Sequence, residues 1–582
     1  MTESAQHWLQ RMRPPKVRVT YEVETGGAVE VKEIPFLVGV FANLSGDREA
    51  GAIYPPDYAS RRMTPIDRDN FDDVMRSIGP RVSLSTIAAT LPDSKADEML
   101  VGDIKFASMA DFEPLHLVRA VPSMDRLYQL RIGLRRMQAK AEASGVFNAA
   151  AIEADRRVAE IDQILSQQLS AILHAKSFQE VEATWRGLYY LVSHTETSAT
   201  LKLSVFNATS QELSDDMDKA AGPDQSYLFK LLYEAGYGSY GDQPYSLLMG
   251  DYKITRSNKD MQFLTRIARL AASVHAPYIA AADADLFGLQ SFGDLSKPRA
   301  LAKIFESVDL AAWQEFRQSE DARYVTLVLP HVLLRLPYGQ QGQAVEGMVF
   351  DEAVHDADKL PNQGHFLWGN AAYMLAQRVA NAFALYHWPM AICGVEGGGL
   401  VEGLPLYSHR NQTDVDQLVC PTEVAITDSR EKELSELGFT PLCYRDGTAS
   451  AAFFGGQTTQ LPKKYFNDLT DANAHLASGL PCMLAASRFA HYIKMIMRAK
   501  VGSFMTRANV ESYLNTWISQ YALLGDNASQ EAKASYPLRQ AGVVVTDVPG
   551  EPGSYQAALL LRLHFQIEEL NTSIRLVVNL PA

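Results

Sequence analysis

The sequence predicts a multidomain protein of the α/β class, in which helices and strands are mixed along the chain (α+β mixed). Three observations support this prediction. The chain has 582 residues, which is enough for several domains and a large apolar core. Apolar residues recur at helical spacing in some segments and form short alternating or continuous runs in others. The two kinds of segment alternate over most of the chain, which is typical of mixed sheets covered by helices.

The first predicted elements are strands. Residues 1–15 are polar. Lys16 to Val23 alternates apolar and polar side chains, which indicates a strand with one buried face. Gly26 and Gly27 lie in a short connector, and strand character resumes from Val29 to Val40.

Two amphipathic helices follow, on either side of a segment of small residues. They are predicted at Val121 to Lys140 and Ile152 to Ile172, and residues 139–150 form the link between them. Helices joined so closely are expected to pack as a hairpin or coiled pair. The first helix is rich in basic residues, namely Arg126, Arg131, Arg135, Arg136 and Lys140. These could form a nucleic-acid stripe, but the formal net charge of −14 favours a solvated face or pairing with an acidic neighbour.

Helical and strand patterns then alternate to the C-terminus. The predicted helices are Phe178 to Ser193, Tyr227 to Ala235, Met261 to Ala276, Ala371 to Tyr386 and Met483 to Arg498. The predicted strands are Thr200 to Phe206, Tyr245 to Tyr252, Gly542 to Asp547, Gln556 to Phe565 and Ser573 to Leu580.

The central stretch, from Phe305 to Gly339, combines both patterns. A helical apolar face including Trp313 and Phe316 is followed by a buried-strand run from Tyr324 to Leu336. Pro330 interrupts this run, so two strands, a bulge or an edge strand are expected. The charged residues beside it are Glu320, Asp321, Arg323 and Arg335. If they are buried, they need partners of opposite charge. If they lie at the solvated ends of a core strand, they need none.

Composition excludes several classes of protein. The four cysteines are far apart and form no CxxC pair, which argues against a disulfide framework or a zinc knuckle. The N-terminus lacks the apolar core of a signal peptide, and no apolar run approaches the ~20 residues of a membrane helix. We therefore expect a cytoplasmic protein without membrane insertion.

Motifs that could indicate an enzyme lack their structural context. Residues 236–241 match GxGxxG, but a helix is predicted before them and a strand after them, which reverses the order of a dinucleotide site. The glycine-rich residues 394–403 lack the Lys-Ser/Thr of a phosphate-binding loop. No metal-ligand or nucleophile motif is present. No catalytic, cofactor-binding or metal-binding residue is predicted, although an unrecognised α/β enzyme remains an alternative.

Several blocks of sequence resemble the contractile sheath of bacterial type VI secretion systems. The blocks similar to its large (TssC-like) subunit are SEDARYV with LPHVLLRLPYG, His365 to Ala372, Pro421 to Val424, Ala451 to Phe454 and Arg488 to Lys494. The blocks similar to its small (TssB-like) subunit are Lys16 to Gly46, Asn70 to Met75 and Asp111 to Pro114.

The resemblance implies that both sheath subunits are fused in one chain. Residues 1–138 resemble the small subunit, 139–150 are a linker, and 151–582 resemble the large subunit, whose part from about 500 to 582 is expected to pack with the small-subunit part. The implied function is structural: a helical homopolymer assembles around a tube of Hcp subunits from a baseplate, and contracts to drive tube and spike out of the cell. The sheath of a related contractile injection or phage-tail-like particle is the alternative.

The resemblance also implies which residues make the contacts. Terminal strands are shared between neighbouring protomers, and the matching residues are Lys16, Val17, Arg18, Val19, Tyr21, Val23, Ile574, Leu576 and Val578. Gly26 and Gly27 match a hinge beside the first strand. A helix that contacts the inner tube matches Ser529 to Gln540, with Glu531, Lys533 and Arg539.

One feature of the family is not found. Its large subunit usually begins with an extra helical segment that a ClpV-type ATPase reads when it recycles contracted sheath. Here the large-subunit resemblance begins near Phe147 with no such segment before it, which argues against recycling by that ATPase. No cofactor and no nucleic acid are implied.

Overall fold

The computed structural model describes residues 21–579, apart from short gaps. The gaps are residues 26–27, 49–56, 93–97, 144–148, 221–224, 238–242, 340–341, 356–360, 411–415, 464–473, 476–477, 501–505, 524–529, 548–554 and 565–572.

A nine-stranded mixed sheet forms the centre of the molecule. Its strands, in spatial order, are β13 (Leu400–Glu402), β17 (Ser450–Phe453), β16 (Phe439–Tyr444), β10 (Val325–Leu329), β9 (Tyr278–Ala282), β8 (Tyr245–Ile254), β3 (Phe36–Ala42), β7 (Leu201–Asn207) and β4 (Thr64–Ile66). The six strands from β16 to β7 run parallel, and antiparallel strands flank them. Parallel strands are buried on both faces, which explains their continuous apolar sequences.

Strand β3 lies between β7 and β8, although it comes from the first 50 residues of the chain. It pairs in parallel with both, from Phe36↔Leu201 on one side to Phe41↔Gly250 on the other. All seven of its residues are buried. The two parts of the chain therefore share one sheet, because removing β3 would leave two central strands without their ladder partners.

Two apolar cores lie on opposite faces of this sheet. Phe36, Val38 and Val40 point into a core that includes helices α6 (Lys176–Ser193) and α12 (Ala372–Tyr386). Leu37 and Phe41 point into a second core, with helices α9 (Asn258–Val274) and α11 (Ala311–Gln318). The alternation of neighbouring residues between the two cores is the period of a strand.

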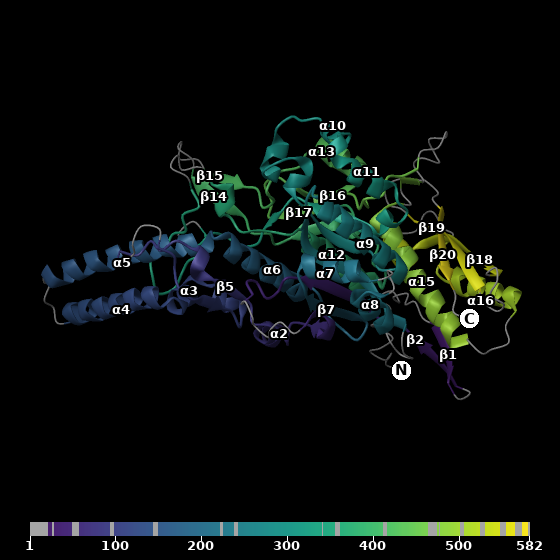
Figure 1. The fold of residues 1–582 in the computed structure, drawn as a ribbon, viewed down its shortest axis with the longest axis horizontal. Coiled ribbons are helices and arrows are strands. Elements are labelled where there is room, and N and C mark those ends of the chain that lie inside the picture. Colours follow the sequence, from purple (N-terminus) through teal and green to yellow (C-terminus); the bar gives the residue numbers. More distant parts are fainter. Residues whose placement is uncertain are drawn as a thin grey trace, which may run out of the picture.

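Helices α4 (Pro122–Ala143) and α5 (Ala149–Leu173) pack side by side and project as a long arm at one end of the molecule (Figure 1). This confirms the predicted helical pair. Both helices extend into the expected linker. Buried Arg131 pairs with Asp162, with 2.5 Å between Nε and Oδ1, and Arg135 pairs with Asp155 at 3.0 Å.

The opposite end of the molecule is built from the C-terminal elements and an N-terminal hairpin (Figure 1). Strands β18 (Leu538–Asp547), β19 (Tyr555–Leu563) and β20 (Ser573–Asn579) form an antiparallel sheet beside α15 (Leu480–Lys500) and α16 (Arg507–Ser519). The short helix α17 (Gln530–Ser535) precedes β18 in the chain. Strands β1 (Tyr21–Thr25) and β2 (Ala28–Lys32) form the hairpin. Ile34, just after it, belongs to the same apolar core as Leu538 and Trp517.

The remaining elements are short and lie around these units. The helices are α2 (Phe71–Ile78), α3 (Pro114–Ala120), α7 (Ser210–Lys219), α8 (Tyr227–Tyr237), α10 (Leu301–Phe305) and α13 (Asp428–Glu436). The strands are β5 (Arg81–Ser83), β6 (Asp103–Lys105), β11 (Val332–Leu333), β12 (Trp368–Gly369), β14 (Tyr407–Arg410) and β15 (Asp416–Val419).

The mixed α/β class is confirmed, and so are the helices and strands predicted after residue 176, within a few residues at their ends. The run from Tyr324 to Leu336 forms two strands, β10 and β11, separated at Pro330 as expected. The strand character predicted from Val29 to Val40 is divided between two strands, β2 and β3, because Glu33 to Pro35 leave the ladder.

Candidate inter-subunit surfaces

Strand β20 ends the C-terminal sheet and offers an unpaired edge. It pairs with β19 from Gln556↔Asn579 to Arg562↔Ser573, and Ile574, Leu576 and Val578 lie in this ladder. No other described strand pairs with β20. An open strand edge is a template for a strand of another chain.

The N-terminal hairpin offers edges of the same kind. Tyr21 and Val23 lie on β1, opposite Lys32 and Glu30 of β2. Lys16, Val17, Arg18 and Val19 lie outside the described residues, as do Gly26 and Gly27, which connect the two strands. Within the described chain, β1 pairs only with β2.

Helix α15 contacts both β1 and β20, so the two sets of strands lie at the same end of the molecule (Figure 1). As far as these strands are described, they do not pair with each other within one chain. The described parts of the two predicted terminal strands therefore lie near each other. Of the segment predicted from Lys16 to Val23, residues 16–20 lie outside the described part, and β1 covers the rest and continues to Thr25.

Arg488 of α15 fastens the hairpin to the central sheet. Its guanidinium is buried and donates hydrogen bonds to the carbonyl oxygens of Ile34 and Pro35, the residues directly before β3. Tyr492, one helical turn later, accepts a hydrogen bond from the Ile34 amide at 3.0 Å. The guanidinium also lies 5.1 Å from the Phe383 ring centroid. Burial lowers the pKa of Arg488, and the carbonyl oxygens and aromatic faces offset the cost of burying its charge.

Arg488 lies in one of the sequence blocks that resemble the large sheath subunit, but no contact of its side chain was predicted. The available signal was a cation within an otherwise apolar helical segment, between Ala486 and Phe489. A buried cation requires partners, but the sequence does not show that these are backbone carbonyls more than 450 residues away.

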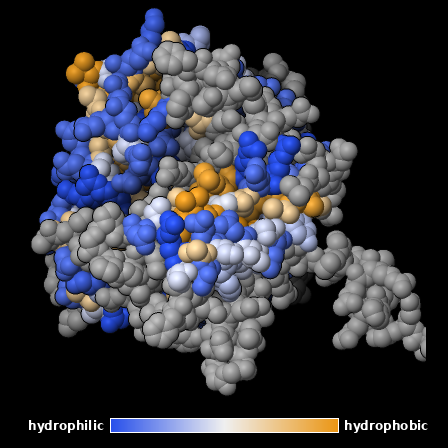
Figure 2. Space-filling model, turned by 90° about the vertical axis from the view of Figure 1, so that its right-hand side faces the viewer, coloured by the Kyte–Doolittle hydropathy of each residue, from blue (hydrophilic) through white to orange (hydrophobic). Residues whose placement is uncertain are grey.

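The end of the molecule that carries these strands also exposes apolar surface. Val544 on β18 and Leu560 on β19 are 46% and 42% exposed. Figure 2, which looks onto this end, shows hydrophobic surface bordered by hydrophilic residues. Apolar surface next to open strand edges is what a neighbouring subunit would cover.

The segment predicted to contact an inner tube is not one helix, as was expected from Ser529 to Gln540. Helix α17 ends at Ser535 and strand β18 begins at Leu538. Lys533 therefore lies on a helix and Arg539 on a strand, and both are half-buried. The side chain of Glu531 lies outside the described residues.

The charges beside the central strands find their partners in other segments. Buried Arg335 pairs with Glu182 of α6 at 2.9 Å and with Glu352 at 2.8 Å. Burial raises the pKa of Glu352, but Arg335 and a hydrogen bond with His174 outweigh it and lower the pKa to about 2. Glu320 pairs instead with Lys463 at the surface. The ion cluster of Arg335, Glu182 and Glu352 links α6, the segment after β11 and the segment around residue 352.

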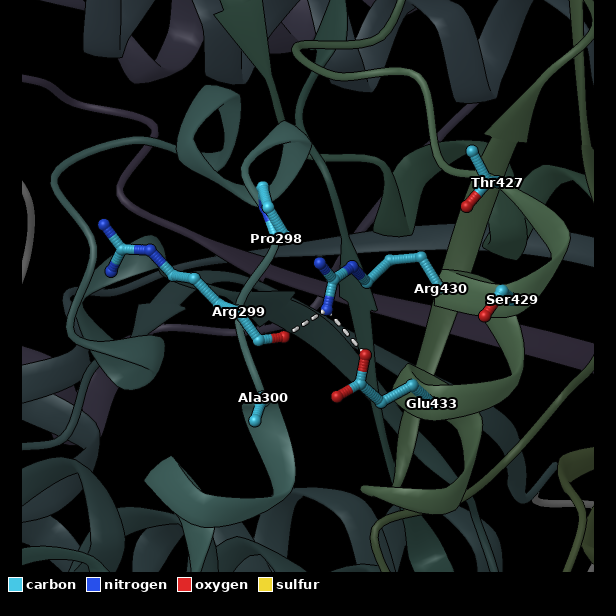
Figure 3. Close-up of a pocket in the computed structure, with 7 residues that line it drawn as sticks. All are labelled: Pro298, Arg299, Ala300, Thr427, Ser429, Arg430 and Glu433. Atoms are coloured by element: carbon cyan, nitrogen blue, oxygen red, sulfur yellow. Dashed lines mark hydrogen bonds and ion pairs between the residues drawn. The ribbon is translucent and has the colours of Figure 1, made fainter.

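A surface pocket lies between α10 and α13 and is lined by charged and hydroxyl side chains (Figure 3). Its lining residues are Pro298, Arg299, Ala300, Thr427, Ser429, Arg430 and Glu433. Arg430 donates to the Arg299 carbonyl oxygen and to Glu433, and Glu433 accepts from the Leu301 amide. These contacts tie the loop to the helix, so the side chains of Arg430 and Glu433 have a structural role.

The GxGxxG match has the reversed context that its sequence predicted. Helix α8 ends at Tyr237 and β8 begins at Tyr245, with residues 238–242 outside the described part. Among the described residues, no cluster of three or more His, Cys, Asp or Glu side chains could hold a metal. No described helix is long and apolar enough to span a bilayer.

Three family models match the chain and together cover most of it. The model described as type VI secretion system, VipA, VC_A0107 or Hcp2 matches residues 9–167. EvpB/VC_A0108, tail sheath N-terminal domain, matches 155–460, and EvpB/VC_A0108, tail sheath gpW/gp25-like domain, matches 469–580.

Two curated relatives from Pseudomonas aeruginosa match different parts of the chain. The type VI secretion system sheath protein TssC1 is 39% identical over 499 residues, which covers 84% of this chain and 99% of the relative. The type VI secretion system sheath protein TssB1 is 36% identical over 134 residues, which covers 23% of this chain and 73% of the relative.

The TssC1 match also corrects where the large-subunit resemblance begins. Its 499 aligned residues are more than the chain contains after Phe147, so the match starts earlier than that. The start of the large-subunit match therefore gives no reason to exclude recycling by a ClpV-type ATPase.

A solved structure, the cryo-EM structure of the anti-feeding prophage (AFP) baseplate, 6-fold symmetrised, shows a weak likeness. It has a TM-score of 0.33 and 12% identity, and the match covers 66% of this chain and 77% of that one.

Proposed function

Because the chain belongs to the family of type VI secretion system sheath proteins, with TssB-like and TssC-like parts in one polypeptide, we propose that it polymerises in the cytoplasm into a helical sheath around an Hcp tube. The sheath grows from a baseplate and contracts to expel the tube and its spike. Its work is mechanical, so no catalysis and no cofactor are required.

The observation that carries this proposal is the match to both sheath proteins within one chain. TssC1 is matched over 99% of its length, so hardly any of the large subunit is missing. The small-subunit part supplies β3 to the central sheet, so the fused protein is one folded body and the two parts are present in a one-to-one ratio.

The geometry supports polymerisation through shared strands. The β1–β2 hairpin and β20 lie at one end of the molecule, and no described strand occupies their outer edges. A row of backbone hydrogen bonds between neighbours resists pulling by many bonds at once. Such a joint keeps subunits connected while the body of each subunit moves.

Electron microscopy of the purified protein tests the proposal. We expect hollow helical tubes, formed without nucleotide, with one copy of the chain as the repeating unit. A protein that stays a discrete monomer or small oligomer over a range of salt and protein concentrations would refute it.

Contact with the inner tube is a second prediction. Reversing the charges of Glu531 and Arg539 together should weaken co-purification of the Hcp tube and leave the sheath intact, because charge complementarity positions such a contact. The control reverses Glu160 and Arg157, which are exposed on the arm. Unchanged tube recovery from the Glu531 and Arg539 variant would show that the contact lies elsewhere.

A further inference from the structure

One side of the arm helix α4 carries exposed apolar and basic residues together, far from the strands at the other end of the molecule (Figure 1). We call this side the basic face of α4. It consists of Arg126, Leu130, Arg136, Met137 and Lys140, all exposed. Leu130 is 61% exposed and Met137 is 66% exposed. Exposed apolar side chains within a charged rim are typical of a protein contact.

The cations of this face are not neutralised by the described part of the chain. Of the five basic residues predicted on this helix, Arg131 and Arg135 pair with acidic residues of α5. Arg126, Arg136 and Lys140 form no ion pair or hydrogen bond with any described residue. Three unpaired cations therefore gather on one helix of a chain whose net charge is −14.

The spacing of the apolar residues suits a neighbouring helix. Leu130 and Met137 are seven residues apart, so they lie on the same side of α4 two turns from each other. Gly133 lies between them, and nothing stands within 4 Å of where its side chain would be. A second helix running alongside could pack its own apolar residues around Leu130 and Met137, with its charged residues against the cations.

We propose that the basic face of α4 binds an acidic amphipathic helix of another protein. Charge complementarity selects this partner, because carboxylates beside its apolar stripe would pair with the three free cations. Two apolar side chains are too few to anchor the arm in a membrane. The net charge of the chain disfavours nucleic acid.

A second copy of the arm fits this face less well than an acidic helix does. The exposed carboxylates Glu153 and Glu160 of α5 are already held by Arg156 and Arg157 of the same helix. A copy of α5 would therefore bring neutralised charges to the basic face of α4.

The test measures binding of a synthetic peptide to the full-length protein. The probe is a fluorescent helical peptide about three heptads long, with leucine at each seventh position and glutamate beside it, and its twin has lysine in place of glutamate. We expect the acidic peptide to bind and the basic twin not to. Reversing Arg126, Arg136 and Lys140 to Glu should weaken binding at least about tenfold, and so should changing Leu130 and Met137 to Gln.

A matched variant separates this site from general electrostatics. Lys230, Lys303 and Lys432 are exposed on three other helices, and reversing them to Glu changes the net charge by the same amount. We expect this variant to bind the acidic peptide within about twofold of the unchanged protein, with circular dichroism confirming that all variants are folded. Equal losses in the two charge-reversed variants, or no binding of the acidic peptide, would overturn the proposal. Association of the arms with each other, lost in the α4 variants, would identify a second copy as the occupant instead.

Discussion

Two buried cations and one half-buried cation are accommodated in three different ways. Arg335 is matched by two carboxylates, those of Glu182 and Glu352. Arg488 is matched by backbone carbonyls and aromatic rings. Lys494 lies 5.9 Å from the ring of Tyr233. Removing one partner of a buried ion pair costs about 3–5 kcal/mol, so the Arg335 cluster is costly to break, whereas the charge on Lys494 works against folding.

The pH dependence of the stability of Lys494→Met tests whether the charge on Lys494 opposes folding. Burial lowers the pKa of Lys494 from its usual 10.5 to about 8. Between these two values the unfolded chain binds more protons than the folded one, so the free energy of unfolding rises with pH in this window. Below pH 8 we expect Lys494→Met to be more stable than the unchanged protein, and the difference should shrink towards pH 10.5. Chemical denaturation at several pH values measures this.

The control for this prediction is Lys259→Met, because Lys259 is exposed on α9. It removes the same charge from an exposed position instead of a half-buried one. A stability difference for Lys494→Met that does not vary between pH 8 and 10.5 would show that Lys494 keeps an ordinary pKa in the folded protein.

At the scale of the elements, the sequence predicts the secondary structure of a segment better than the position of that segment in the fold. The apolar run of β3 predicts a buried strand, but the same run would suit any interior position, so its place between β7 and β8 could not be predicted. Arg335 needed a partner, and the acids near it in sequence are Glu320 and Asp321. Its actual partners come from other segments, because burial brings together groups that sequence separates.

The predictions for the candidate surfaces show the same difference between local structure and long-range contacts. The terminal strand at the C-terminus and the helical pair were predicted within a few residues. The inner-tube segment was expected to be one helix and is a short helix followed by a strand. Residues that act through long-range contacts, such as Arg488, carry no local pattern that names their partner.

The connector between β1 and β2 of the N-terminal hairpin leads to a prediction about contraction. Inserting a Gly-Ser pair after Gly27 should leave assembly intact and weaken contraction, because slack between β1 and β2 lets one subunit move before it pulls its neighbour. Electron micrographs of triggered sheaths give the fraction that shortens.

The same insertion after Gly447, at the exposed turn between β16 and β17, serves as the control. It should not affect contraction. Normal shortening of the Gly27 variant would show that this connector transmits no force.

At the scale of the whole molecule, the helical arm and the terminal strands are separated in space. The arm lies at one end, the terminal strands lie at the other, and the nine-stranded sheet connects them (Figure 1). The sheet includes a strand from the N-terminal part, and Arg488 ties the hairpin to that strand. A load applied to the terminal strands therefore reaches the central sheet through short, buried contacts.

Proline substitutions in β20 test whether its open edge joins neighbouring subunits. Leu576 and Val577 are consecutive, so their amide groups point to opposite sides of the strand, one towards β19 and one towards the open edge. Proline removes the amide hydrogen and is tolerated at an edge but not inside a sheet. One of Leu576→Pro and Val577→Pro should therefore lower the melting temperature, while the other should leave it almost unchanged.

The variant that keeps its melting temperature decides the question. If neighbours pair along β20, this variant loses a hydrogen bond at every interface of the polymer and should form fewer and shorter tubes than the unchanged protein. Tubes of normal number and length from this stable variant would mean that the open edge of β20 is not an interface, and that the apolar surface around Val544 and Leu560 joins the subunits without it.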